Sequence, residues 1–262
     1  MRSLLLLGLL ATTSTAFADM HLALAPGEAF TFRVGYTIFS NAGEIKITSQ
    51  AETDDHQPSL LVVTTTSTRG FLRSVYPFDA RAESVYNLKT GHMMVHTERS
   101  VHGKKSTDTT LAFNYENRTA DFQNLVNSSK SQIVPLPPGD PMDLITNLIQ
   151  ARTWKLQPGQ TMDALVMFEE EPYELTFHAE GYETVKTPLG TFDTLVIVPK
   201  MEKTPPKGMF KRGSTVRVWI SQDERHLPVK FEVEFKFGSG VATLVNYQPP
   251  ASPAVPAAAT SP

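Results

Sequence analysis

The chain of 262 residues contains no cysteine. Without cysteine it can form no disulfide bond, and it has neither a thiolate ligand for a metal nor a cysteine nucleophile. Attachment of a lipid through a cysteine is excluded for the same reason. We therefore expect the folded protein to be stabilised by a packed core alone.

A long apolar segment is also missing, since the longest such run is LLLLGLLA at residues 4–11. A membrane-spanning helix needs ~20 apolar residues, so this run is too short. A basic residue precedes it, and the small first and third residues of Ala16-Phe17-Ala18 after it suit a signal peptidase. We predict a secretory signal over residues 1–18, cleaved between Ala18 and Asp19. The alternative, an uncleaved anchor, fits less well because a polar chain begins directly afterwards.

Clusters of basic residues are absent. After removal of residues 1–18, the chain has 23 Lys and Arg and 27 Asp and Glu, a formal net charge of −4. This mild acidity does not favour nucleic acid as a partner. No later segment has the length and apolarity of a membrane span. We therefore predict a soluble periplasmic or secreted protein, without a transmembrane segment in the mature chain.

Motifs that identify an enzyme are absent as well. The chain has no Gly-x-Ser-x-Gly, no Walker loop and no dinucleotide-binding fingerprint. We therefore expect no catalytic residues and no cofactor. A hydrolase stays open as a less favoured alternative, which would require a pocket that unites a histidine with a carboxylate.

The histidines and the acidic runs do not predict a metal site. His92, His96 and His102 share one parity, but on a strand His92 and His96 would lie about 13 Å apart, too far to bind one ion. We expect solvated strand histidines. Residues 169–171 are three consecutive glutamates, whose oxygens could bind calcium, but no Asp-x-Asp-x-Asp-Gly pattern accompanies them. We expect a solvated loop and no bound metal.

Alternation of apolar and polar residues is the dominant pattern of the chain. It occurs in residues 30–38 and again in residues 230–237, and each segment predicts a strand with one buried and one solvated face. Further candidate strands are residues 45–51, 60–68, 82–87, 93–101, 107–115, 161–168, 173–182, 192–198, 215–220 and 242–247. Turn-forming residues separate them at 41–43, 89–91, 102–104, 116–117 and 238–240. We therefore expect successive hairpins.

One segment, residues 140–151, follows a helical pattern. Asp140 is a candidate N-cap and Pro141 suits the first helical position. A single apolar stripe follows at Leu144, Ile145, Leu148 and Ile149. We expect a helix of about three turns that covers one opening or edge of the sheet. The predicted fold is mainly β: a large curved antiparallel sheet or a barrel-like β structure with one short central helix.

Length and composition predict the domain organisation. Residues 19–247 are expected to form a single β-rich domain, with two halves joined near residues 135–158. Residues 248–262 are rich in proline and alanine, without charge or aromatic side chains, and predict a flexible tail. A docked extended strap is the alternative for this tail.

A short internal similarity bears on the two halves. LAPGE at residues 24–28 and LQPGQ at residues 156–160 each predict a Pro-Gly turn that leads into a strand. The pair is consistent with a duplication, although two ordinary turns would look the same.

An ordered set of short segments resembles a known family. The segments are Val34-Gly35-Tyr36, residues 69–87 with Asp79, Ser84 and Tyr86, residues 144–159, residues 187–192 (TPLGTF), residues 218–223 (VWISQD) and residues 227–230 (LPVK). In this order they resemble a bacterial family of exported proteins, domain of unknown function 3108. The resemblance implies a β-rich envelope protein and carries over no activity, substrate or catalytic residue. Residues 219–230 are also similar, more remotely, to periplasmic lipoprotein carriers, whose curved sheet wraps an apolar cavity.

Basic side chains beside apolar ones give the candidate ligand site. The predicted ligand-binding residues are Arg69, Phe71, Arg73, Tyr76, Met209, Phe210, Lys211 and Trp219. Basic groups next to apolar side chains suit an anionic amphiphile such as a lipid. Ordinary surface charge is the alternative for the basic residues, and a core position is favoured for Trp219.

These patterns predict a noncatalytic envelope protein that binds a lipid-like or other hydrophobic ligand. The reason is that long strands with one apolar face have too little helix to cover that face. The alternative is a structural or assembly partner of another envelope protein, which would offer edge strands or residues 203–212.

Overall fold

The computed structural model of the chain describes residues 22–54, 57–206, 210, 214–235 and 238–250. The predicted signal at residues 1–18 and residues 251–262 of the predicted tail lie outside this part, so both stay predictions. Within the described ranges, no helix is long and apolar enough to cross a membrane.

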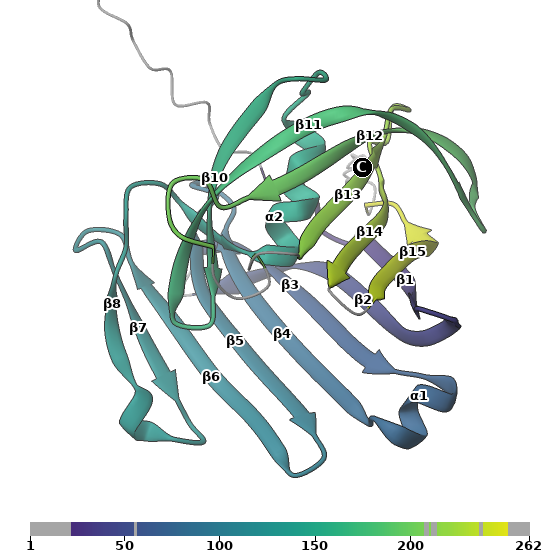
Figure 1. Ribbon diagram of the computed structural model, residues 1–262. Coiled ribbons are helices and arrows are strands. Elements are labelled where there is room, and N and C mark those ends of the chain that lie inside the picture. Colours follow the sequence, from purple (N-terminus) through teal and green to yellow (C-terminus); the bar gives the residue numbers. More distant parts are fainter. Residues whose placement is uncertain (1–21, 55–56, 207–209, 211–213, 236–237, 251–262) are drawn as a thin grey trace, which may run out of the picture.

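Figure 1 shows how strands dominate the described residues. The strands are β1 (Ala29–Tyr36), β2 (Phe39–Asp54), β3 (Gln57–Thr68), β4 (Phe78–Asn87), β5 (Met93–His102), β6 (Lys105–Asn114), β7 (Thr119–Asn124), β8 (Gln132–Pro135), β9 (Pro141–Asp143), β10 (Thr161–Phe168), β11 (Glu171–Thr187), β12 (Gly190–Lys200), β13 (Thr215–Ser221), β14 (Pro228–Phe235) and β15 (Gly238–Gln248). The helices are α1 (Gly70–Val75), α2 (Leu144–Gln150) and the 3-10 turns η1 (Ser128–Lys130) and η2 (Ala151–Thr153).

All of these strands belong to one curved sheet, in the order β8-β7-β6-β5-β4-β3-β2-β1-β15-β14-β13-β12-β11-β10-β9. Within β1 to β8, consecutive strands pair with each other, and the same holds within β10 to β15. Each set is therefore a run of antiparallel strands. The two runs meet where β1 pairs with β15. Among the described strands, the sheet stays open between β8 and β9. The structure therefore confirms the predicted mainly β fold class.

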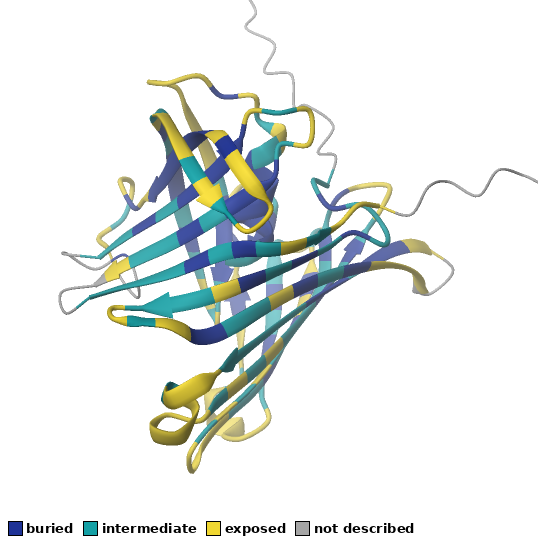
Figure 2. Ribbon diagram, turned by 90° about the vertical axis from the view of Figure 1, so that its right-hand side faces the viewer, coloured by how far each residue is buried: buried dark blue, intermediate teal, exposed yellow. Residues whose placement is uncertain are grey.

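Alternation along the strands separates an inner from an outer face. Phe30 and Phe32 of β1 are fully buried, whereas Arg33 is exposed. Tyr86 of β4 is also fully buried and lies on the inner face, where it contacts the residue that begins α2. Figure 2 shows buried residues concentrated on one part of the sheet, while its far end is intermediate or exposed. The core lies between α2 and the inner face.

The N-cap of α2 lies three residues later than the sequence predicts. The carboxylate of Asp143 accepts a hydrogen bond from the Thr146 amide at 2.9 Å, which makes Asp143 the N-cap. Pro141 and Met142 belong instead to β9, which pairs in parallel with β10. Asp140 is therefore not the N-cap, because strand pairing keeps the residues after it extended. α2 packs within the curve of the sheet (Figure 1).

Polar contacts fix both ends of this helical segment. Asp143 also accepts hydrogen bonds from the hydroxyls of Ser84 and Tyr86, at 2.9 and 3.0 Å. Burial and then the negative charge of Asp143 raise the pKa of Tyr86 above its ordinary value, so its hydroxyl keeps its proton. Beyond the end of α2, Arg152 forms an ion pair with buried Glu28 at 2.7 Å. These contacts tie α2 to β4 and to the segment that leads into β1.

Two predicted turns lie within strands. Residues 41–43 belong to β2, where the register with β1 shifts opposite Gly35 and forms a β-bulge. At Gly43 a Cβ would lie 2.8 Å from the carbonyl oxygen of Ser67, so close strand approach requires glycine there. Residues 238–240 begin β15. The prediction for residues 41–43 was wrong because turns and bulges favour the same residue types. The prediction for residues 238–240 was wrong because these residues pair in regular register with the end of β14.

α1 is a second helix, which the sequence does not predict. None of its residues is buried, so it lacks the apolar stripe by which α2 can be recognised. Arg69 is its N-cap residue and makes no capping hydrogen bond through its side chain. α1 connects β3 to β4 at one end of the sheet (Figure 1).

The two Pro-Gly turns have the same geometry. Gly27 and Gly159 have φ values of 85° and 86°, a conformation that glycine adopts without strain. Their amides donate to the backbone carbonyls of Ser49 and Ala179, at 2.8 and 2.7 Å. Each turn leads into an eight-residue strand, β1 or β10, and then into the longest strand of its run, β2 or β11. The two halves begin with the same construction, and duplication stays a prediction.

The run of glutamates lies at the turn between β10 and β11. Glu169 and Glu170 form this turn and border a hollow of about 200 Å³ that residues of β6 and β7 also line. Burial and then the charges of Glu170 and Glu98 raise the pKa of Glu169 above its ordinary value. The turn therefore concentrates negative charge next to the inner face.

We expect Asp143→Ala to lower the free energy of unfolding by about 2–4 kcal/mol, because two buried hydroxyls lose their acceptor and α2 loses its cap. Urea unfolding followed by circular dichroism measures this loss. Asp140→Ala is the matched control, since Asp140 is the N-cap that the sequence alone predicts, and it should cost less than about 1 kcal/mol. Equal losses in the two variants would contradict the assigned cap.

We expect Glu169→Gln to stabilise the protein at pH 7 and not at pH 4. A raised pKa in the folded state means that ionisation of Glu169 disfavours folding, and this effect disappears below the ordinary glutamate pKa. Glu169 is partly exposed, so the gain at pH 7 should stay below about 1 kcal/mol. Chemical unfolding at both pH values measures it, with Glu116→Gln in the exposed β6–β7 turn as control. The same gain at both pH values would show that charge is not the cause.

Candidate ligand site at the rim of the sheet

Four of the predicted ligand-binding residues come together at one end of the sheet. Arg69 is the N-cap of α1, Phe71 and Arg73 lie within it, and Tyr76 is its C-cap. Phe71 and Tyr76 are 64% and 46% exposed. The sequence can group these residues because they are close along the chain.

Two of the other four predicted residues, Phe210 and Trp219, do not join this surface. Phe210 and Trp219 are buried, at 8% and 3% exposure. The indole N–H of Trp219 donates to Glu183 at 2.8 Å, so its polar edge already has a partner. Because Phe210 and Trp219 are buried, we do not include them in the candidate site. Trp219 has the core position that the sequence favours for it. Met209 and Lys211 lie outside the described residues.

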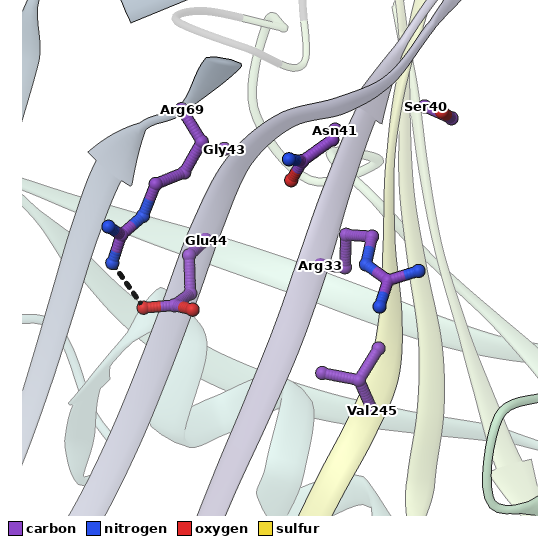
Figure 3. A pocket seen from close by; sticks show the side chains of 7 residues that line it. All are labelled: Arg33, Ser40, Asn41, Gly43, Glu44, Arg69 and Val245. Atoms are coloured by element: carbon purple, nitrogen blue, oxygen red, sulfur yellow. Dashed lines mark hydrogen bonds and ion pairs between the residues drawn. The ribbon is translucent and has the colours of Figure 1, made fainter.

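A hollow of about 530 Å³ opens on the outer face of the sheet beside α1 (Figure 3). It is lined by Arg33, Ser40, Asn41, Gly43, Glu44, Arg69 and Val245. These residues come from β1, β2, β15 and the start of α1, segments that are far apart in sequence. We call this hollow, defined by these residues, the rim hollow.

Two β-bulges shape the rim hollow. In β2, residues 40–42 stand opposite Gly35 alone, which displaces them from regular pairing. The carbonyl of Ala42 accepts a hydrogen bond from the Arg69 amide at 2.8 Å, so this bulge also positions α1. In β15, Val245 is the extra residue where the register with β1 shifts. Bulges redirect side chains and often border functional sites.

The rim hollow carries more positive than negative charge. The guanidinium of Arg69 forms an ion pair with Glu44 at 2.7 Å. Arg33 makes no ion pair with any residue that the structure describes, and Figure 3 shows its guanidinium turned away from Glu44. Ser40 and Asn41 add neutral hydrogen-bond donors. Such a set of donors suits a carboxylate or a phosphate.

An apolar surface adjoins the rim hollow. The rings of Phe39 and Phe71 stack with their centroids 5.7 Å apart, and Ile38 next to Phe39 is 89% exposed. Phe39 directly precedes Ser40, which lines the hollow. Charged and apolar surfaces therefore meet at this end of the sheet.

Arg73 is paired within the protein. It donates to Asp79 at 2.7 Å, and this hydrogen bond holds the pKa of Asp79 below its ordinary value. Both side chains are exposed, so the pair is screened by water and contributes little to stability. Arg73 therefore lies at the edge of the candidate site. Arg33, which the sequence does not single out, is a cation of the site without an ion pair among the described residues.

The inner face beyond α2 is small and polar, contrary to the apolar face expected from the strand pattern. The inward side chains of β3 to β6 in this stretch are Thr64, Thr66, Ala80, Ala82, Glu98, Ser100, Thr107 and Thr109. The strand registers place them on the same face as Leu60 and Tyr86, which are fully buried nearer α2. The strongly apolar part of this face is thus covered by α2, and the uncovered stretch suits an apolar ligand poorly.

A histidine, a serine and an aspartate are hydrogen-bonded in series on the inner face. The hydroxyl of Ser84 donates to Asp143, and its Oγ lies 2.9 Å from Nδ1 of His96. Because Ser84 gives its proton to the carboxylate, Nδ1 of His96 must donate to Ser84. A nucleophilic serine requires a histidine that accepts the proton instead. This series therefore ties the start of α2 to β4 and β5.

Other histidines contact single carboxylates. His92 lies 3.4 Å from Asp140, and His178 lies 3.0 Å from Glu202. Within the described part of the chain, no group of three or more histidine, aspartate and glutamate side chains is arranged to hold a metal ion.

Similarity to solved structures supports the fold. A structure from Brucella abortus, described as a beta-barrel-like protein of domain of unknown function DUF1849, aligns with a TM-score of 0.54 at 6% identity. The alignment covers 86% of this chain and 99% of that chain, and at this identity it shows the fold alone.

Two further structures are less similar. A DUF1089 family protein from Pseudomonas aeruginosa aligns with a TM-score of 0.36 at 13% identity, over 71% of this chain and 87% of that chain. The lipoprotein LppX from Mycobacterium tuberculosis aligns with a TM-score of 0.27 at 16% identity, over 87% and 89%. Neither likeness supports an inference about function. Among curated proteins, no match to this sequence was found.

The sequence itself matches a family model over residues 31–245, which spans both runs of strands and the rim hollow. This match confirms the family resemblance that the ordered segments indicate. The chain belongs to the family described as protein of unknown function DUF3108.

Proposed function

We propose that the protein is an exported, noncatalytic binding protein, and that it binds an anionic amphiphile at the rim hollow. Export is supported by the predicted signal at residues 1–18. Binding is supported by one observation above all: the guanidinium of Arg33, which forms no ion pair with any described residue, lines a hollow that adjoins exposed apolar side chains.

The anionic group of the ligand would contact the polar side of the hollow. Arg33 supplies the free charge, and Asn41 and Ser40 supply further donors. The guanidinium of Arg69 forms an ion pair with Glu44, and its other N–H groups can donate to the ligand. The shared chemistry is a phosphate or carboxylate group, which guanidinium and amide donors bind well.

The apolar part of the ligand would lie against the stacked rings of Phe39 and Phe71. Phe71 is largely exposed to water in the free protein, so covering it stabilises a complex. The outer rim is favoured over the inner face, because the uncovered inner stretch is lined by threonine, serine, alanine and Glu98.

An assembly role remains the second candidate, and the edge strand β8 favours it. β8 ends the strand order, and Ile133 within it is 62% exposed. An exposed edge can pair with a strand of another protein. However, β8 has only four residues, and Pro135 offers no N–H for pairing. The amphiphile is therefore the better supported candidate.

We expect the exported protein to bind dihexanoyl phosphatidylglycerol, used below the concentration at which it forms micelles, more tightly than dihexanoyl phosphatidylcholine. Isothermal titration calorimetry measures both affinities. Arg33→Gln should weaken binding of the anionic amphiphile about tenfold or more, because it removes a charge-assisted hydrogen bond.

Arg81→Gln is the matched control, since Arg81 is an exposed arginine on β4 that pairs with Glu83 away from the rim hollow. It should bind like the wild type. Equal affinities for the two amphiphiles, or an Arg33→Gln variant that binds like the wild type, would overturn the proposed function.

A further inference from the structure

Exposed apolar side chains are concentrated at the end of the sheet that carries α1. Among the described residues, twelve large apolar side chains are exposed, and seven of them lie at the turns and strand ends of this end: Ile38, Phe71, Val75, Tyr76, Val101, Leu125 and Val126. The opposite ends of the hairpins expose single side chains such as Leu88 and Leu189. Such an unequal distribution marks an interaction surface.

Ring contacts join three of these turns into one surface. Phe39, after the β1–β2 turn, stacks on Phe71 of α1 with 5.7 Å between ring centroids. Tyr76, after α1, stacks on His102 at the end of β5 with 3.7 Å between ring centroids. We call Ile38, Phe39, Phe71, Val75, Tyr76 and Val101 the apolar rim.

Cationic side chains border the apolar rim. Lys104 and Lys105 in the β5–β6 turn are exposed, and neither has an ion pair within the part of the chain that the structure describes. Arg69 and Arg73 on the other side are matched by Glu44 and by Asp79. Lys104 and Lys105 therefore give this group of side chains an excess of positive charge over Glu44 and Asp79, although the predicted mature chain carries a net charge of −4.

This combination complements an anionic lipid surface. Exposed aliphatic and aromatic side chains at turn tips can enter the boundary between headgroups and acyl chains, while lysines reach the charged headgroups. Lysine is depleted at protein–protein interfaces, whereas Lys104 and Lys105 border this surface, so a lipid surface fits it better than a protein partner does.

We propose that the apolar rim docks on the surface of an anionic lipid bilayer. This inference rests on the proposed function, because the anionic bilayer is the surface from which the rim hollow would receive its ligand. Ser40 directly follows Phe39 of the rim, and Arg69 lies two residues before Phe71. Docking therefore places the rim hollow at the level of the lipid headgroups.

Vesicle sedimentation tests the proposal. The exported protein should sediment with vesicles of dioleoyl phosphatidylglycerol and stay in solution with vesicles of dioleoyl phosphatidylcholine. The paired change Val75→Ser and Val101→Ser should weaken binding about tenfold, because both side chains lose apolar area that the bilayer covers. Lys104→Gln with Lys105→Gln should weaken it by a similar factor, and more salt should reduce binding of the wild type.

Leu189→Ser is the matched control, since Leu189 is 42% exposed in the β11–β12 turn, and it should leave vesicle binding unchanged. Circular dichroism checks that each variant is folded. No binding to either vesicle, equal binding to both, or a Val75→Ser, Val101→Ser variant that binds like the wild type would overturn docking.

The same variants separate docking from the proposed function. The Val75→Ser, Val101→Ser protein should bind monomeric dihexanoyl phosphatidylglycerol like the wild type, because neither residue lines the rim hollow. Loss of vesicle binding with retained amphiphile binding supports docking specifically. Amphiphile binding without any vesicle binding would overturn docking and leave the proposed function intact.

Discussion

Asp143 holds α2 against the sheet by accepting hydrogen bonds from the Thr146 amide and from the hydroxyls of Ser84 and Tyr86. At the other end of the segment, Arg152 reaches buried Glu28. Between these contacts α2 covers the apolar part of the inner face. Once that part is covered, the strand ends beyond α2 have little apolar surface to bury, and their inner side chains are small and polar. The exposed apolar side chains lie instead at the outer rim.

Segments that carry the family resemblance contribute to this construction. The hydroxyls of Ser84 and Tyr86 donate hydrogen bonds to Asp143. In the turn between β13 and β14, the hydroxyl of Ser221 donates to Asp223 and accepts from the Leu227 amide, both at 2.7 Å. These polar side chains fix backbone segments in place. The segments that carry the family resemblance therefore indicate the fold of the protein rather than a chemical activity.

The sequence predicts most strands because alternation of side chains is a local property that the sheet retains. It does not predict where α2 begins, because Asp140-Pro141 and Asp143 are both suitable starts and only pairing with β10 decides between them. Similarly, residues 41–43 have the composition of a turn, and only the partners of β2 show that they form a bulge.

The sequence likewise predicts one part of the candidate site and misses the other. Arg69, Phe71, Arg73 and Tyr76 are close in sequence, and the sequence alone groups them. Arg33 and Val245 join them only because β1 pairs with both β2 and β15, contacts that bring together the two ends of the chain. Trp219 was misleading, since aromatic side chains suit both a ligand site and a core, and burial decides for the core.

In the proposed function, the ligand binds at the outer rim and not on the inner face. Hydrogen exchange with and without dihexanoyl phosphatidylglycerol tests it most directly. We expect the amphiphile to slow exchange in residues 33–44 and 69–76, which line or adjoin the rim hollow. Slower exchange confined to residues 60–66, 80–86 and 107–111, whose inward side chains line the inner face, would contradict it.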